Sequence, residues 1–104
     1  MLCIYIYKLN MNIKIFNDDL PSEIDLSNEK VVALDNEALG LVMGRDPLTL
    51  VQIGLQSDKC LIIKLDRNSY NAPNLKKFLS TSEAQFIMHY ARQDLLWLKY
   101  HLNV

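Results

Sequence analysis

The chain has 104 residues and a mass of 12.0 kDa, with 50% hydrophobic and 22% charged residues. This length and composition fit one small globular domain, because so apolar a chain can bury enough surface to offset the entropy lost on ordering. Eleven Lys and Arg against twelve Asp and Glu give a formal net charge of −1. That balance excludes the broad basic surface of proteins that coat nucleic acid.

The first residues form an apolar run, 2–9, that is shorter than the roughly 20 residues of a membrane span. The run has neither the basic segment nor the cleavage site of a signal peptide, so we expect a cytoplasmic protein without a membrane partner. Cys3 and Cys60 lie far apart and outside any C-x-x-C spacing. They predict free thiols, with neither a disulfide framework nor a zinc site.

A second methionine, Met11, begins a new alternating pattern over residues 12–16 that is typical of a strand. Two interpretations stay open. In one, translation begins at Met11, and residues 1–11 are a non-native extension of a domain over 12–104. In the other, the first apolar run is a genuine additional strand.

Three further strands are predicted over residues 30–34, 49–55 and 60–65. The run 30–34 is continuous and β-branched, as in a strand that is covered on both faces. Short turns between these strands, such as Ser57–Lys59, predict a three-stranded antiparallel meander.

The apolar period then becomes helical. A helix is predicted over 72–79, with Pro73 in its first turn, followed by a strand over 85–89. In a second helix from Ala91, one stripe is expected to contain Leu95, Leu98 and Leu102. Trp97 and Tyr100 flank that stripe, which favours core or partner contacts for them. The order of elements predicts an α/β domain with a mixed sheet.

Two carboxylates, Asp35 and Glu37, follow directly after the apolar strand 30–34. Residues i and i+2 of a strand point to the same face, with Cα atoms about 7 Å apart. Two carboxylates placed so repel one another unless a cation lies between them, and oxygen ligands of this kind favour Mg²⁺ or Mn²⁺. A chance pair at a solvated strand end is the alternative.

A second polar segment, His89–Asp94, follows the last predicted strand and enters the second helix. Asp94 falls in the first turn, where the helix dipole favours an anion whether or not the residue binds a metal. Taken singly, His89 is typical of a strand end and Arg92 of a solvated surface.

Four blocks in order, 32–41, 45–53, 70–77 and 89–94, resemble the ribonuclease D type of 3′–5′ exonuclease. This group belongs to the DEDD superfamily, and the resemblance extends from about residue 13 to residue 104. It implies a ribonuclease H-like α/β fold and removal of nucleotides from the 3′ end of single-stranded RNA or DNA.

The resemblance also implies roles for individual residues. Asp35 and Glu37 match the D-x-E motif whose carboxylates bind two catalytic Mg²⁺ or Mn²⁺ ions, and Asp94 matches the acid of the second motif. Leu41 matches a residue that packs against terminal bases, and we place His89 and Arg92 with it among the substrate-binding residues. Two-metal phosphodiester hydrolysis is the implied mechanism.

The chain departs from the family pattern in two ways. Asn36 stands between the carboxylates where Thr is common, and the third motif of the family, with a fourth carboxylate and a general base, has no match before Val104. We therefore expect a C-terminally truncated domain that is weak or inactive alone, and that forms a homo-oligomer or pairs with a complementing C-terminal fragment. The alternative is a catalytically inactive remnant that serves as a nucleic-acid-binding or protein-interaction module.

Overall fold

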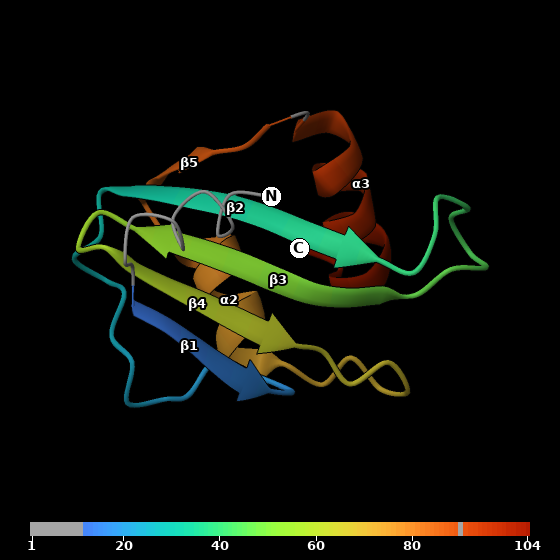
Figure 1. Ribbon diagram of the computed structural model, residues 1–104, viewed down its shortest axis with the longest axis horizontal. Coiled ribbons are helices and arrows are strands. Elements are labelled where there is room, and N and C mark those ends of the chain that lie inside the picture. The colour runs from blue at the N-terminus through green and yellow to red at the C-terminus, as the bar shows by residue number, and fades with distance from the viewer. Residues whose placement is uncertain (1–11, 90) are drawn as a thin grey trace.

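The computed structural model describes residues 12–89 and 91–104, which form one mixed sheet with two helices against one face (Figure 1). The strands are β1 (Asn12–Asn17), β2 (Val31–Ala38), β3 (Leu48–Leu55), β4 (Lys59–Lys64) and β5 (Gln85–Ile87), and the helices are α2 (Pro73–Thr81) and α3 (Ala91–Leu102).

The strand order is β1-β4-β3-β2-β5. β2, β3 and β4 form the predicted antiparallel meander, whereas β1 joins β4 and β5 joins β2 in parallel. In Figure 1, α2 crosses behind β3 and β4, and α3 lies behind the end of β2. The predicted α/β class with a mixed sheet is therefore confirmed.

Three expectations concern the N-terminal region, the cysteines and the membrane. Residues 1–11 and Cys3 lie outside the described residues, so both interpretations of the first apolar run stay open. Cys60 is buried on β4 and is not a free thiol, so that expectation is wrong for this residue. Within the described ranges, neither helix has the length and apolar character that a membrane crossing requires.

β2 is longer than predicted and is less completely covered. Its ladder with β3 continues past Leu34, pairing Asp35 with Gln52 and Glu37 with Leu50 before a bulge at Ala38. Burial alternates along β2, so only one of its faces is fully covered. The strand buried on both faces is instead β3, the middle strand of the sheet, whose residues 51–55 are all buried. Asp35 and Glu37 therefore lie within a regular strand.

The apolar face of α3 differs from the predicted stripe. Leu98 and Leu102 are buried as expected, but Leu95 is 53% exposed and Trp97 is only 3% exposed. Trp97 and Leu98 lie three and four residues after Asp94, so this half of the helix surface faces the sheet. The helix therefore turns Trp97 to the core and leaves Leu95 exposed.

The first turn of α2 is capped from a distant part of the chain. Helix starts leave backbone N–H groups without intrahelical partners. Here the carboxylate of Asp19 accepts hydrogen bonds from the backbone N–H of Asn74 at 3.0 Å and of Leu75 at 2.9 Å. Asn74 Nδ2 in turn donates to the carbonyl of Leu20 at 2.9 Å. Asp19 therefore attaches the segment after β1 to the start of α2.

We expect Asp19→Asn to lower the free energy of unfolding by about 1–2 kcal/mol, because an amide leaves one of the helix N–H groups without an acceptor. Denaturant midpoints measure the effect. Asp18→Asn is the matched control, since Asp18 has a positive φ of 72° that Asn also tolerates. Equal losses in the two variants would contradict the capping role.

Candidate active site

The candidate site lies where two parallel strands end. β5 pairs with β2 in the register Val31–Gln85 to Ala33–Ile87, and Gln85 N donates to the carbonyl of Lys30 at 2.8 Å. Because the strands are parallel, the chain leaving β5 runs beside the second half of β2 and enters α3 there. In open α/β sheets, ligands bind outside such carboxyl ends.

A pocket of about 280 Å³ opens at this place between β2, the following loop and α3. The sequence-predicted carboxylates of Asp35, Glu37 and Asp94 all line it, together with Leu41 and His89. The rest of its lining is formed by Asn36, Ala38, Gly40, Gln93 and Trp97. The structure thus brings together five of the six predicted site residues.

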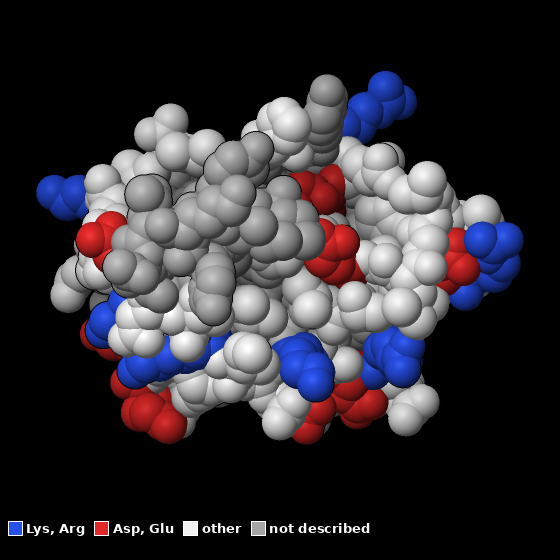
Figure 2. Space-filling model, viewed as in Figure 1, with Lys and Arg blue, Asp and Glu red and all other residues white. Residues whose placement is uncertain are grey.

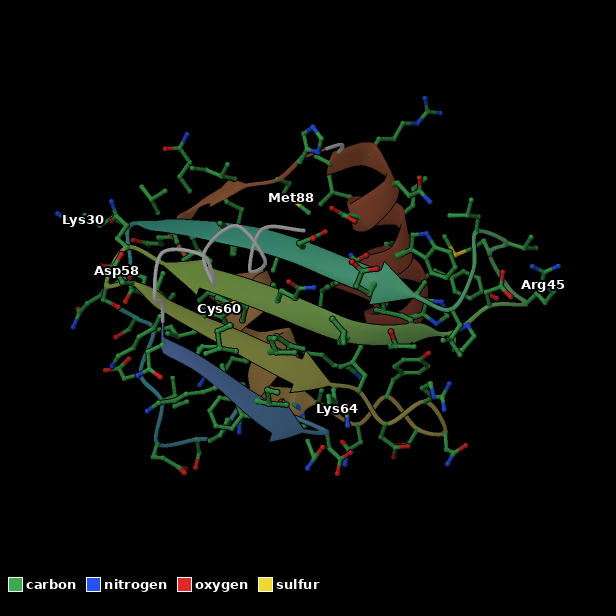
Figure 3. All side chains as sticks on the ribbon, viewed as in Figure 1. Lys30, Arg45, Asp58, Cys60, Lys64 and Met88 are labelled. Carbon is green, nitrogen blue, oxygen red and sulfur yellow. The ribbon has the colours of Figure 1, made fainter. Side chains whose placement is uncertain are left out.

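The pocket is acidic. Figure 2 shows Asp and Glu side chains gathered in a recess of this face, and no Lys or Arg is among the described residues that line the pocket. In Figure 3, Lys30 lies at the opposite end of β2, Lys64 at the end of β4 and Arg45 at the tip of the β2–β3 loop. None of these three cations lines the pocket.

The Asp94 carboxyl responds to its burial and to the charges of the other two carboxylates. Burial, followed by the charges of Asp35 and Glu37, raises the pKa of the Asp94 carboxyl from 3.8 to about 6. The nearby His89 acts in the opposite direction. Desolvation and a like charge both favour the neutral acid. Asp94 is therefore the carboxyl of the pocket whose neutral form is favoured.

The loop after β2 holds Leu41 at the edge of the pocket. Asp46 Oδ2 accepts from the backbone N–H of Val42 at 2.9 Å, and Arg45 bonds both oxygens of the same carboxylate. A Cβ at Gly40 would collide with this carboxylate, so any larger residue there would have to displace the Asp46 side chain. The Leu41 side chain lines the pocket from this loop and is 83% exposed.

A second cavity of about 670 Å³ adjoins the first and is more apolar. Arg92 lies here with Met43 and Leu96, and not in the acidic pocket. Leu41, Gln93 and Trp97 line both cavities, so the two form one continuous concave region. The structure therefore places the predicted Arg92 beside the carboxylates' pocket rather than within it.

Trp97 is the buried wall between the two cavities, a position that sequence reasoning missed. Its ring stacks on His101 with centroids 5.3 Å apart and an angle of 5°. Tyr70 and Tyr100 pack around the same imidazole at 5.0 and 4.9 Å. Burial lowers the pKa of His101, which favours the neutral ring. The spacing of three residues between Asp94 and Trp97 is the signal that could have placed both at one site.

The donor set suits a hard divalent cation, since it consists of carboxylate oxygens. Burial and then the charges of Asp35 and Glu37 raise the pKa of Asp94, and a cation would relieve the repulsive part of this effect. As the side chains stand, however, no three His, Cys, Asp or Glu groups of residues 12–89 and 91–104 are arranged to hold a metal ion. The carboxylates meet in one pocket without forming a closed coordination shell, and their role as metal ligands stays a prediction.

Comparison with known proteins identifies the family to which the chain belongs. The sequence model of the 3′–5′ exonuclease family matches residues 16–104. A comparison with curated proteins found no match.

Solved structures match as well. Brucella melitensis NrnC with bound Mg²⁺ is 35% identical, with a TM-score of 0.78 over 88% of this chain and 45% of NrnC. The same protein bound to pGG is 34% identical, with a TM-score of 0.81 over 90% of this chain and 46% of NrnC. The chain thus spans less than half the length of these structures. Family model and fold agree, and the chain belongs to the 3′–5′ exonuclease family, with the ribonuclease H-like fold of its DEDD nucleases.

Proposed function

We propose that this chain is the part of a 3′–5′ exonuclease domain that binds the metal ions and the 3′ end of a single-stranded RNA or DNA. The observation that carries the proposal is the meeting of Asp35, Glu37 and Asp94 in one pocket at the carboxyl ends of two parallel strands. Family membership, and relatives determined with Mg²⁺ and with pGG, support it.

Asp35, Glu37 and Asp94 would hold two Mg²⁺ or Mn²⁺ ions. Ions bound there would supply a metal-activated water and stabilise the charge of an in-line phosphoryl transition state. Asp94 must be ionised to take part, so it gives up its proton on binding. Leu41, held at the edge of the pocket, would contact the terminal base, with His89 beside the carboxylates and Arg92 in the adjoining cavity near the phosphates.

We further propose that the described site is incomplete, and that a second polypeptide surface completes it. The described residues bring three carboxylates to the pocket, and the relatives are more than twice as long as the segment that matches them. Leu95 and Leu96 on α3 are exposed, and exposed apolar side chains of this kind mark interaction surfaces. A second copy of this chain or a complementing C-terminal fragment would cover them.

One observation favours a different function. Within the described residues, no three acidic or imidazole groups are arranged to hold a metal ion. A chain that keeps this arrangement would act as a nucleic-acid-binding or protein-interaction module without hydrolysis. Metal-independent binding of a single-stranded oligonucleotide would support that alternative.

The first prediction from the proposed site concerns the pH dependence of stability. Because the pKa of Asp94 is about 6 in the folded chain against 3.8 for the free side chain, the folded state holds this proton more tightly. Its stabilising effect is complete below about pH 4 and is lost as the pH rises through about 6. Asp94→Asn, which mimics the neutral acid, should match the wild type near pH 4 and exceed its stability near pH 7.

Denaturant unfolding without added metal, at several pH values, measures this difference. The matched control is Asp58→Asn, an exposed turn residue with a positive φ of 63° that asparagine tolerates. A stability difference between Asp94→Asn and wild type that stays constant with pH would contradict the site electrostatics.

The second prediction concerns metal. Asp35→Asn should weaken Mn²⁺ binding by at least about tenfold, since even residues outside the coordination shell cost 10–100-fold when altered. Calorimetric titration of wild type, Asp35→Asn and Asp58→Asn with Mn²⁺ provides the comparison. Isotherms that coincide for wild type and Asp35→Asn would rule out a metal site at this pocket.

The third prediction concerns activity. The isolated chain should degrade 3′-labelled single-stranded RNA in Mn²⁺ at least about 10²-fold more slowly than a full-length relative, because a general base alone contributes about 10²–10⁴. A polypeptide equivalent to the unmatched half of the relatives, supplied in cis or in trans, should restore the rate. Rapid stepwise degradation by the isolated chain, abolished in Asp35→Ala, would show that the three carboxylates suffice.

A further inference from the structure

Asn36, the residue between the two carboxylates of β2, contacts both sides of the acidic pocket. Its backbone N–H donates to Asp35 Oδ1 at 2.9 Å. Its side-chain Nδ2 donates to the backbone carbonyl of Asp94 at 3.2 Å. A single residue therefore joins the strand that carries two of the carboxylates to the helix that carries the third.

Strand geometry explains how Asn36 can do this. Successive side chains of a strand point to opposite faces, so Asn36 points opposite to Asp35 and Glu37. Along β2 the residues on its face, Val32 and Leu34, are buried in the core against the helices. Asn36 is the polar member of this row and is only 9% exposed. Its side chain therefore reaches α3 on the core face of β2, whereas Asp35 and Glu37 lie on the opposite face of the strand.

The acceptor of the Asn36 side-chain hydrogen bond is the backbone carbonyl of Asp94. Asp94 lies in the first turn of α3, and its backbone carbonyl moves with its Cα and hence with its carboxylate. A buried amide needs hydrogen-bond partners, so loss of this contact leaves a polar group unsatisfied or lets the helix shift. Asp35, Glu37 and Asp94 line one pocket, and like charges placed so repel one another in the absence of a cation. The Asn36 contact opposes the separation that this repulsion favours.

We propose that Asn36 is a positioning residue that fixes the start of α3 against β2 and so sets the separation between Asp94 and the carboxylates of β2. The proposal rests on the proposed function, because the separation matters if the three carboxylates share metal ions. This role requires no contact of the Asn36 side chain with metal or substrate. Its side chain acts through the backbone of Asp94.

The chain offers a matched control for the test. Asn74 Nδ2 also donates to a backbone carbonyl, that of Leu20, at 2.9 Å, and the bond is likewise partly buried. Asn74 lies on α2, outside both cavities of the site. Asn36→Leu and Asn74→Leu therefore remove the same kind of bond, with the same change of side chain, at the site and away from it.

Two readouts separate positioning from a general structural role. Mn²⁺ affinity should fall about three- to tenfold in Asn36→Leu, the equivalent of one net hydrogen bond, and should be unchanged in Asn74→Leu. In the metal-free protein, amide hydrogen exchange in the first two turns of α3 should accelerate in Asn36→Leu and stay at the wild-type rate in Asn74→Leu. Asn36→Val, which suits a strand well, should behave like Asn36→Leu, and it serves as the test variant if the leucine does not fold.

Unchanged exchange in α3, or wild-type Mn²⁺ affinity in a folded Asn36 variant, would overturn the positioning role. An equal loss of affinity in Asn74→Leu would also overturn it, since the effect would then reflect general loosening of the fold. If wild-type protein binds no Mn²⁺, the proposed function fails, and the exchange rates in α3 alone decide whether Asn36 fixes the helix.

Discussion

The parallel pairing of β5 with β2 is short, yet the geometry of the whole site depends on it. Three residue pairs, from Val31–Gln85 to Ala33–Ile87, set the register. They send the chain after β5 along the outer half of β2, so that α3 begins beside Asp35 and Glu37. An antiparallel strand at the same edge would carry its following segment to the opposite end of the sheet. The direction of this one strand thus makes a carboxylate from α3 a neighbour of two carboxylates from β2.

A site assembled in this way works against the stability of the fold that carries it. Partial burial and like charge make the ionised pocket unfavourable without a cation, and the rest of the domain must hold it in place. The surrounding structure supplies several constraints. Asp46 organises the loop that carries Leu41, Asn36 links β2 to α3, and the rings around His101 fix Trp97. These contacts connect the loop, β2 and α3 that surround the acidic pocket.

Much of this architecture follows from local pattern, and the rest depends on contacts between distant residues. Alternation and helical spacing predicted the meander and both helices, and the D-x-E spacing placed Asp35 and Glu37 on one face. Periodicity failed for α3, because it cannot tell which of two apolar flanks, Leu95 or Trp97, turns to the sheet. The links from Asp19 to Asn74 and from Asn36 to Asp94 span 55 and 58 positions, and each depends on tertiary structure that no local pattern encodes. The position of Arg92 outside the acidic pocket likewise follows from the packing of α3.

The position of Trp97 has an optical consequence. It is the chain's only tryptophan, and its indole lies at the wall shared by both cavities, stacked on an imidazole. All of the tryptophan emission of this chain therefore comes from the site itself. A ligand that enters either cavity, or a proton that reaches His101, changes the surroundings of that single fluorophore. Occupancy of the pocket can thus be followed in the native chain without any attached label.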